Sequence, residues 1–291
     1  MTAIDRLVVA GVGLINGSLA RALRACDEVG EVVALGRNAD RLAAAEAAGV
    51  IDRGETDPAA ALSGADMVVV GVPLSAVRDV LAQIAPHLPA EAVITDVGST
   101  KASVVADAEH ALGGDLRRFV PAHPIAGTEH NGFEAAFPEL FRGRRVVITP
   151  TEATEAAATA RVRGMWEACG AHVIEMSVGH HDRMLAATSH LPHLLAYGLV
   201  DTLARWDDSN EVFEYAAGGF RDFTRIASSD PLMWRDICFA NRSALLETLA
   251  HYRADLEQLT ALVRDGDEAG LEAVFRRAKT IRDRHRPVFE Q

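Results

Sequence analysis

The strongest candidate for chemistry in this sequence is a histidine that follows a predicted strand. His123 comes shortly after the apolar pair Phe119-Val120 and far downstream of a glycine-rich turn at residues 11–13. An imidazole at the carboxyl end of a strand, beyond a dinucleotide-binding unit, is placed to act as acid or base beside a nicotinamide. The sequence therefore predicts hydride transfer in which His123 handles the proton.

A strand, a glycine turn and a helix start follow one another near the N-terminus. Apolar residues 7–10 precede Gly11, which permits a tight turn, and Gly13, which lets the backbone approach a pyrophosphate at the helix N-terminus. The third fingerprint position holds Asn16 in place of glycine, and its amide could turn toward the phosphates; the alternative is a purely structural turn. The predicted cofactor contacts are Gly11, Gly13, Leu14, Ile15, Asn16, Gly36, Arg37, Asn38, Val72 and Pro73.

The end of the second predicted strand favours NADP over NAD. NAD enzymes commonly place an acid here to accept hydrogen bonds from the ribose 2′-hydroxyl, but Gly36 and Arg37 follow this strand and the first acid is Asp40. Arg37 can pair with a 2′-phosphate, and no carboxylate stands beside it. The alternative is that Arg37 is a solvated surface charge and both cofactors are accepted.

Short apolar runs alternate with helical patterns over the first part of the chain. The predicted buried strands are residues 7–10, 31–35, 67–70 and 92–95, with further strands at 119–120, 145–148 and 172–174. Helical patterns at 19–25, 41–48 and 153–169 lie between strands. This alternation predicts an α/β fold with a doubly wound, mostly parallel, Rossmann-like sheet over residues 1–178.

The pattern changes near residue 178. Residues 185–206, 231–263 and 267–289 carry long helical patterns, so residues 179–291 are expected to form a helical domain that pairs with a second copy. His180 and His181 are expected to begin the first of these helices. The apolar stripe that suggests pairing consists of Leu245, Leu246, Leu249, Tyr252, Leu256 and Leu259.

Composition excludes several classes of function. The formal net charge of −12 argues against a nucleic-acid surface, which needs a basic face. No apolar run is long enough to cross a membrane, and the three widely spaced cysteines fit a reducing compartment, so we expect a cytoplasmic protein. His190 and His193 share a helix face but lack the usual glutamate and have a proline between them, so no metal is expected.

Five segments together identify a family. They are residues 11–15, 96–99 (Asp-Val-Gly-Ser), 123–127 (His-Pro-Ile-Ala-Gly), 189–193 (Ser-His-Leu-Pro-His) and 219–225 (Gly-Phe-Arg-Asp-Phe-Thr-Arg). With these segments in this order and spacing, the chain resembles the prephenate dehydrogenases, including the cyclohexadienyl and arogenate dehydrogenases of tyrosine biosynthesis. The resemblance covers nearly the whole chain. It implies oxidation of prephenate to 4-hydroxyphenylpyruvate with loss of carbon dioxide and hydride transfer to NAD(P).

The resemblance also implies roles for individual residues. His123 is expected to hydrogen-bond the C4 hydroxyl of the substrate ring as a neutral base, with Ser99 making a second bond to that hydroxyl. Arg225 matches the arginine that binds a substrate carboxylate, and His193 a polar contact near the substrate side chain. The predicted substrate-binding residues are Arg225, His193, Ser189, Glu129, Gly127, Thr128 and Asp222.

Several alternatives stay open at this point. Prephenate and arogenate are not distinguished, and we favour Arg225 on the pyruvyl carboxylate, because a clamp on the ring carboxylate would oppose its loss. A β-hydroxyacid dehydrogenase would need a helical lysine, yet none occurs in the helical region before Lys279. A silent NADP-sensing regulator would not need His123, Ser99 and Arg225.

Overall fold

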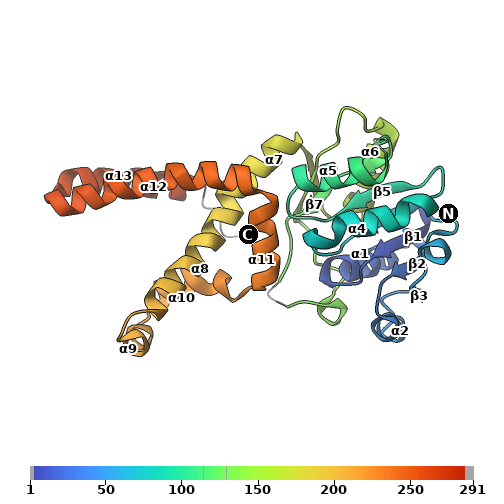
Figure 1. Cartoon of the computed structure of the whole chain (residues 1–291), viewed down its shortest axis with the longest axis horizontal. Coiled ribbons are helices and arrows are strands. Elements are labelled where there is room, and N and C mark those ends of the chain that lie inside the picture. The colour runs from blue at the N-terminus through green and yellow to red at the C-terminus, as the bar shows by residue number, and fades with distance from the viewer. Residues whose placement is uncertain (1–2, 114, 129, 286–291) are drawn as a thin grey trace. The chain divides into compact units, whose positions relative to one another are not determined.

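Six parallel strands form the larger of two sheets in the computed structural model, which describes residues 3–113, 115–128 and 130–285 (Figure 1). In spatial order they are β3 (Arg53–Glu55), β2 (Val29–Leu35), β1 (Ile4–Ala10), β4 (Met67–Val70), β5 (Val93–Asp96) and β6 (Phe119–Val120). The strand order reverses at β1, which pairs with β2 on one side and β4 on the other. This confirms the predicted doubly wound sheet, and ligands in such sheets bind at the carboxyl ends of the strands beside the reversal.

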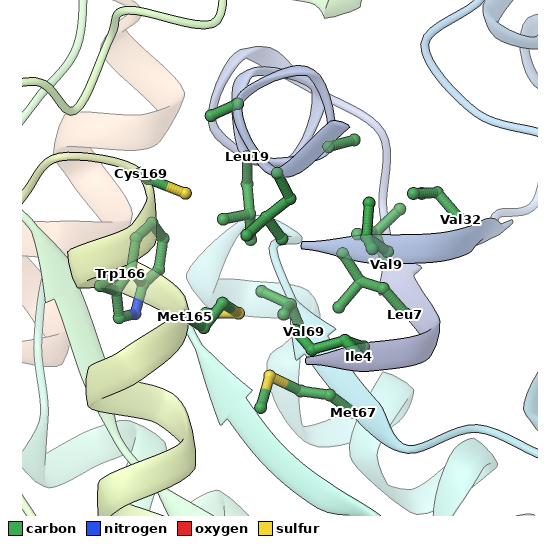
Figure 2. Packing of buried hydrophobic residues seen from close by; sticks show 14 of the residues in the cluster. Ile4, Leu7, Val9, Leu19, Val32, Met67, Val69, Met165, Trp166 and Cys169 are labelled. Carbon is green, nitrogen blue, oxygen red and sulfur yellow. The ribbon is translucent and has the colours of Figure 1, made fainter. Parts of the chain in front are cut away.

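Helices cover both faces of this sheet because its strands are apolar on both sides. On β1, Leu7 and Val9 join one buried cluster and Val8 joins another. The first cluster includes residues of α1 (Leu14–Ala25), α2 (Ala39–Ala47) and α6 (Ala156–Ala168). The second includes residues of α3 (Pro58–Leu62), α4 (Leu74–Ile84) and α5 (Ala102–Ala111). Figure 2 shows part of the first cluster, with Leu19 of α1 above β1 and Trp166 of α6 beside it.

A second, three-stranded sheet carries the predicted histidine. It consists of β7 (Ala122–Pro124), β8 (Arg145–Ile148) and β9 (His172–Glu175), and α6 connects β8 to β9. β7 and β8 are antiparallel, whereas β8 and β9 are parallel. The sequence predicted β8 and β9 but not β7, and it did not predict the separation of this sheet from the main one. Only Pro121 separates β6 from β7, so the chain changes sheets there, and proline cannot donate a ladder hydrogen bond.

Helices make up the rest of the described chain. They are α7 (Val178–Leu185), α8 (Leu191–Ala204), α9 (Ser209–Glu214), α10 (Gly218–Thr224), α11 (Pro231–Ala240), α12 (Arg242–Asp265) and α13 (Glu268–Arg284). The π-helical turn η3 (Ala186–His190) joins α7 to α8, and the 3₁₀ turn η4 (Arg225–Ser228) follows α10. The pattern at 231–263 was expected to be continuous, but the structure interrupts it at Asn241. That residue uses its side chain to bond α7 and η3, as described below.

The chain divides into two compact units, residues 1–242 and residues 243–291. The first unit contains both sheets together with helices α7 to α11, and every site residue discussed below. The division between residues 178 and 179 remains a prediction. In the described part of the chain, no helix combines the length and apolar character that crossing a bilayer requires. The cytoplasmic location likewise remains a prediction.

Candidate active site

The glycine turn after β1 fits an anionic cofactor. Gly11 has φ +86°, and a Cβ there would lie 2.9 Å from both the Gly71 carbonyl oxygen and Val72 Cγ1. Helix α1 begins at Leu14 with no side-chain cap and no acid in its first turn, so its first N–H groups remain available to a ligand. A Cβ on Gly13 would meet no atom within 4 Å. These features leave the room and the donors that a pyrophosphate needs.

Backbone hydrogen bonds bring the other predicted cofactor segments to the same place. Gly11 N donates to Leu35 O at 2.8 Å, and Gly71 N donates to Ala10 O at 2.9 Å. Gly36 and Val72, which follow directly, therefore lie near the glycine turn. Arg37 is exposed, and Asn38 caps α2 by accepting a hydrogen bond from Arg41 N at 3.0 Å.

Asn16 does not turn its side chain toward a phosphate, contrary to the expectation. Its side chain is buried, and Nδ2 donates to Gly11 O at 2.8 Å, with the carbonyls of Ala10 and Val69 each 3.4 Å away. A Cβ on Gly71 would collide with this amide. The carbonyls left at the ends of two strands attract the amide inward, so Asn16 packs helix against sheet where glycine is more usual.

The backbone beside His123 is fixed by a buried ion pair. Side chains alternate along β7, so Ala122 joins the core with α6 and His123 faces the opposite side. Ala122 N donates to Asp96 Oδ1 at 3.1 Å, and Lys101 Nζ donates to Ala122 O at 2.6 Å and to Asp96 Oδ2 at 2.5 Å. Asp96 and Lys101 are fully buried. They satisfy both polar groups of Ala122 and hold β7 against the end of β5.

The ring of His123 is held by a neighbour from α7. His123 Nδ1 lies 2.9 Å from His181 Nε2, and His181 Nδ1 lies 2.8 Å from Asp182 Oδ1. All three side chains are buried. The two imidazole rings meet edge to face, with centroids 5.1 Å apart. Because Nδ1 is engaged in this contact, Nε2 is the nitrogen of His123 left for a substrate.

Asp182 also fixes the segment that carries Ser99. Its two carboxylate oxygens accept hydrogen bonds from Lys101 N at 2.8 Å and Ala102 N at 2.9 Å, where α5 begins. Ser99, half-buried, stands just before these residues, between β5 and α5. Burial raises the pKa of Asp182, but the bonds from His181 and from these two amides outweigh it and hold that pKa below its usual value. Asp182 is therefore a carboxylate at neutral pH.

Burial keeps His123 neutral. It lowers the pKa of His123 well below the ordinary value, and His181, Lys101 and His190 lower it further by their positive or potentially positive charge. A neutral imidazole with one engaged nitrogen can accept a proton at the other. The candidate base is therefore in the correct ionisation state at neutral pH.

The Ser-His-Leu-Pro-His segment divides into two environments. His193 stacks on Trp234, with ring centroids 3.4 Å apart and planes at 17°, and its Nδ1 donates to Ser189 O at 2.8 Å. Burial lowers the pKa of His193; the bond to Ser189 opposes this, while the charge of Arg225 reinforces it. Arg225 and His193 therefore act on one another, although the sequence places them on separate helical segments.

His190 lies inward from this stack. It is buried, its Nδ1 lies 3.1 Å from Asn241 Nδ2, and that amide also donates to Asp182 O at 2.7 Å. Burial lowers the pKa of His190 to about 4. His190 is thus a packing group that ties η3 to α7 and α11, and this agrees with the π-helical turn at its position.

Other predicted substrate residues lie on exposed segments. Gly127 and Thr128 are exposed, and Thr128 Oγ1 bonds the backbone of His130 at 3.2 Å. Asp222 is exposed beside Arg221, 3.4 Å away. Glu129 lies outside the described residues. Across the residues that the structure describes, no group of three or more His, Cys, Asp or Glu side chains is arranged to hold a metal ion.

Sequence reasoning missed the residues that hold His123. His180 and His181 lie in the first turn of a helix, as expected, but the contact of His181 with His123 crosses 58 residues, and Asp182 reaches Ala102 across 80. Lys101 lies two residues beyond the Asp-Val-Gly-Ser segment, residues 96–99, and was not assigned a role.

Comparisons with known proteins agree over almost the whole chain. Residues 19–175 match the family model "Prephenate dehydrogenase, nucleotide-binding domain", and residues 177–277 match "Prephenate dehydrogenase, dimerization domain". A cyclohexadienyl dehydrogenase of Zymomonas mobilis is 39% identical over 273 residues, covering 92% of each chain.

Solved structures show the same likeness. The prephenate dehydrogenase of A. aeolicus, in complex with hydroxyphenyl propionate and NAD+, superposes with a TM-score of 0.91 at 35% identity, covering 96% of this chain and 98% of that one. Synechocystis arogenate dehydrogenase superposes with a TM-score of 0.83 at 28% identity, covering 96% and 99%.

Proposed function

The chain belongs to the prephenate dehydrogenase family, and from this premise we propose that it oxidises prephenate to 4-hydroxyphenylpyruvate with loss of carbon dioxide. It is an NAD(P)-dependent dehydrogenase. The observation that carries the specific proposal is the buried, neutral His123. Its Nδ1 contacts His181, and this contact leaves Nε2 as the nitrogen that can accept a proton. Arogenate, converted to tyrosine by the same chemistry, is the second candidate substrate, because an arogenate dehydrogenase shares this fold over nearly its full length.

The proton of the substrate's C4 hydroxyl goes to His123. As the O–H bond breaks, Nε2 of the imidazole forms a new N–H bond, and the electron pair left on oxygen forms the carbonyl-like bond that aromatisation then converts to a phenol. A nicotinamide cofactor, its pyrophosphate held at the glycine turn of Gly11 and Gly13, would supply the acceptor for the hydride that leaves C4. Loss of the ring carboxylate as carbon dioxide supplies the electrons that aromatise the ring.

Ser99 and the helical segments orient the substrate. Ser99 donates to or accepts from the same C4 hydroxyl and so fixes the direction of the departing hydrogen. Arg225 binds the pyruvyl carboxylate, with His193 beside it, since the ring carboxylate must lose its charge in the transition state. Supporting contacts are assigned to Ser189, Gly127, Thr128, Glu129 and Asp222. The electrostatic coupling of His193 with Arg225 supports this grouping.

Two further features belong to the proposal. NADP is favoured over NAD, because Arg37 is exposed at the end of β2 with no acid before Asp40. The enzyme works as a homodimer, because residues 177–277 match a dimerization domain. The exposed apolar side chains within residues 243–291 support this: they include Leu246, Tyr252, Leu256, Val263, Phe275 and Ile281.

The deciding experiment is a turnover assay with the purified full chain. Prephenate and arogenate are each mixed with NAD+ and with NADP+, and the absorbance of the reduced nicotinamide is followed. Formation of reduced cofactor together with 4-hydroxyphenylpyruvate or tyrosine supports the proposal. No reduction with either substrate and either cofactor would remove it. Substrate analogues that lack one carboxylate then test Arg225. Arg225→Ala should lower the turnover of the analogue without the ring carboxylate, but it should not change the turnover of the analogue without the pyruvyl carboxylate.

A further inference from the structure

We propose that His181 and Asp182 are positioning residues that set the tautomer of His123. In this assignment Asp182 dictates where His181 carries its proton, and His181 dictates where His123 carries its own. The inference rests on the proposed function, because it concerns the same base. It adds two residues that the catalytic assignment above does not use.

The first step is the bond between Asp182 and His181. Asp182 is ionised, and a carboxylate can only accept hydrogen bonds. At 2.8 Å from Asp182 Oδ1, Nδ1 of His181 must therefore carry the hydrogen. The same oxygen already accepts from Lys101 N, also at 2.8 Å, so the carboxylate is held from several directions and cannot rotate away without losing these bonds.

The second step is the bond between the two histidines. A neutral imidazole protonated on Nδ1 has its lone pair on Nε2. Nε2 of His181 therefore accepts the hydrogen bond at 2.9 Å, and His123 must donate it from Nδ1. His123 is left with its lone pair on Nε2, which is the form that can accept a proton from a hydroxyl. The opposite tautomer would present an N–H to the substrate hydroxyl and could not act as its base.

Several charged or polar groups surround the two rings. His181 is fully buried, and the groups that face the two rings are Asp182 on α7, Lys101 before α5, and His190 on η3. Lys101 is itself bonded to Asp96. The single carboxylate orients the ring of His181 through their hydrogen bond, and it lies close to the charge that appears only when His123 takes the substrate's proton.

Asp182 also links the two groups that meet the substrate hydroxyl. It holds the first amides of α5, directly after Ser99, and through His181 it holds His123. One side chain of α7 thus sets the distance between a serine after β5 and a histidine on β7. Loss of Asp182 is therefore expected to lower kcat more than it raises KM.

The test compares His181→Gln with His181→Leu in the full chain. A glutamine carbonyl can still accept from His123 Nδ1, whereas leucine fills the buried space without accepting anything. We expect kcat to fall about 10²-fold in His181→Leu and about tenfold or less in His181→Gln, with KM for substrate changed little in both. A purely structural role predicts no advantage for glutamine. Equal kcat values in the two variants would overturn the proposal. His180→Gln, an exposed neighbour on the same helix, is the control and should retain wild-type kcat.

A spectroscopic readout separates this inference from the proposed function. Nitrogen NMR of the histidine rings reports which nitrogen of His123 carries the hydrogen, without any turnover. We expect Nδ1–H in the wild type and a shift toward Nε2–H in Asp182→Asn, whose amide can donate to His181 Nδ1. An Nε2–H tautomer in the wild type would overturn the proposal even in an active enzyme. Conversely, Nδ1–H in a protein that reduces no cofactor would uphold the relay and reject the reaction. If Asp182→Asn does not fold, the wild-type tautomer and the two His181 variants still decide.

Discussion

The two halves of the candidate site differ in the atoms that form them. The cofactor half consists of backbone: Gly11 and Gly71 bring three strand ends together through main-chain hydrogen bonds, and Gly13 leaves space for a ligand. The acid–base half consists of side chains: His181 of α7, itself bonded to Asp182, contacts His123 of β7. A site made of backbone depends on glycines that lack a Cβ, and these can be recognised within a short stretch of sequence. A side-chain site depends on single atoms that arrive from distant parts of the chain.

The largest effect on kcat is expected when the proposed base is removed. His123→Gln keeps a polar side chain of similar reach on β7 but cannot accept a full proton near neutral pH. We expect kcat to fall about 10³-fold, because general base catalysis contributes on the order of 10²–10⁴. Cofactor binding, measured by the fluorescence of the reduced nicotinamide, should stay within about twofold, since the glycine turn is untouched.

The control for this variant is His110→Gln, at an exposed position in the last turn of α5. It should retain the wild-type kcat. If His123→Gln also turned over at the wild-type rate, the hydroxyl proton would have to leave by another route, and His123 would not be the base.

The same division explains how much could be predicted from the sequence. Most of the strands, the glycine turn and the helical second half follow from local patterns, and the structure confirms them. The short strands β3 and β7 were missed, and His123, expected just after a strand, lies on β7. The inward turn of Asn16 was missed, because it depends on carbonyls of two strands and on the space beside Gly71. The contact of His181 with His123 was missed for the same reason. Nothing in the sequence around residue 181 shows that β7 lies opposite.

Acid should destabilise the side-chain half through His190. Its pKa is about 4 in the folded chain and about 6.5 when unfolded, so the unfolded state takes up the proton first as the pH falls. The contribution of neutral His190 to the free energy of unfolding is fully present above about pH 6.5 and is lost progressively down to about pH 4. A shift of this size corresponds to about 3 kcal/mol for this buried ring. We expect the free energy of unfolding of the wild type to fall by about this much more than that of His190→Asn between pH 7 and pH 4. Parallel pH curves in urea denaturation would contradict the assignment.

Two glycines on the cofactor half separate folding from binding. A Cβ on Gly71 collides with the buried amide of Asn16, whereas a Cβ on Gly13 meets no atom within 4 Å. Gly71→Ala should lower the free energy of unfolding by about 2 kcal/mol, because the core beside it is already filled. Gly13→Ala should leave stability within about 0.5 kcal/mol. It should nevertheless raise KM for the cofactor roughly tenfold, since the methyl group takes the space where a pyrophosphate approaches.

Thermal unfolding and cofactor titration of both variants provide the measurement. The pair serves as its own control, because each change adds one methyl group to the same turn region. If Gly13→Ala bound the cofactor like the wild type, the open space beside Gly13 would not be the phosphate position, and the turn would be structural only.

The smallest effect is expected for Arg37, the side chain that the cofactor half contributes to the choice between NADP and NAD. Arg37 is exposed after β2, and Asn38 beside it is occupied in capping α2, so the guanidinium is the group available to a 2′-phosphate. Arg37→Ser should lower kcat/KM for NADP about tenfold and leave the value for NAD within about twofold, because an exposed charged contact contributes only about 1 kcal/mol. Arg161→Ser, at an exposed position on α6, makes the same change of charge and should alter neither value. A ratio of NADP to NAD that is the same in Arg37→Ser as in the wild type would mean that this half of the site recognises the cofactor through its main chain alone.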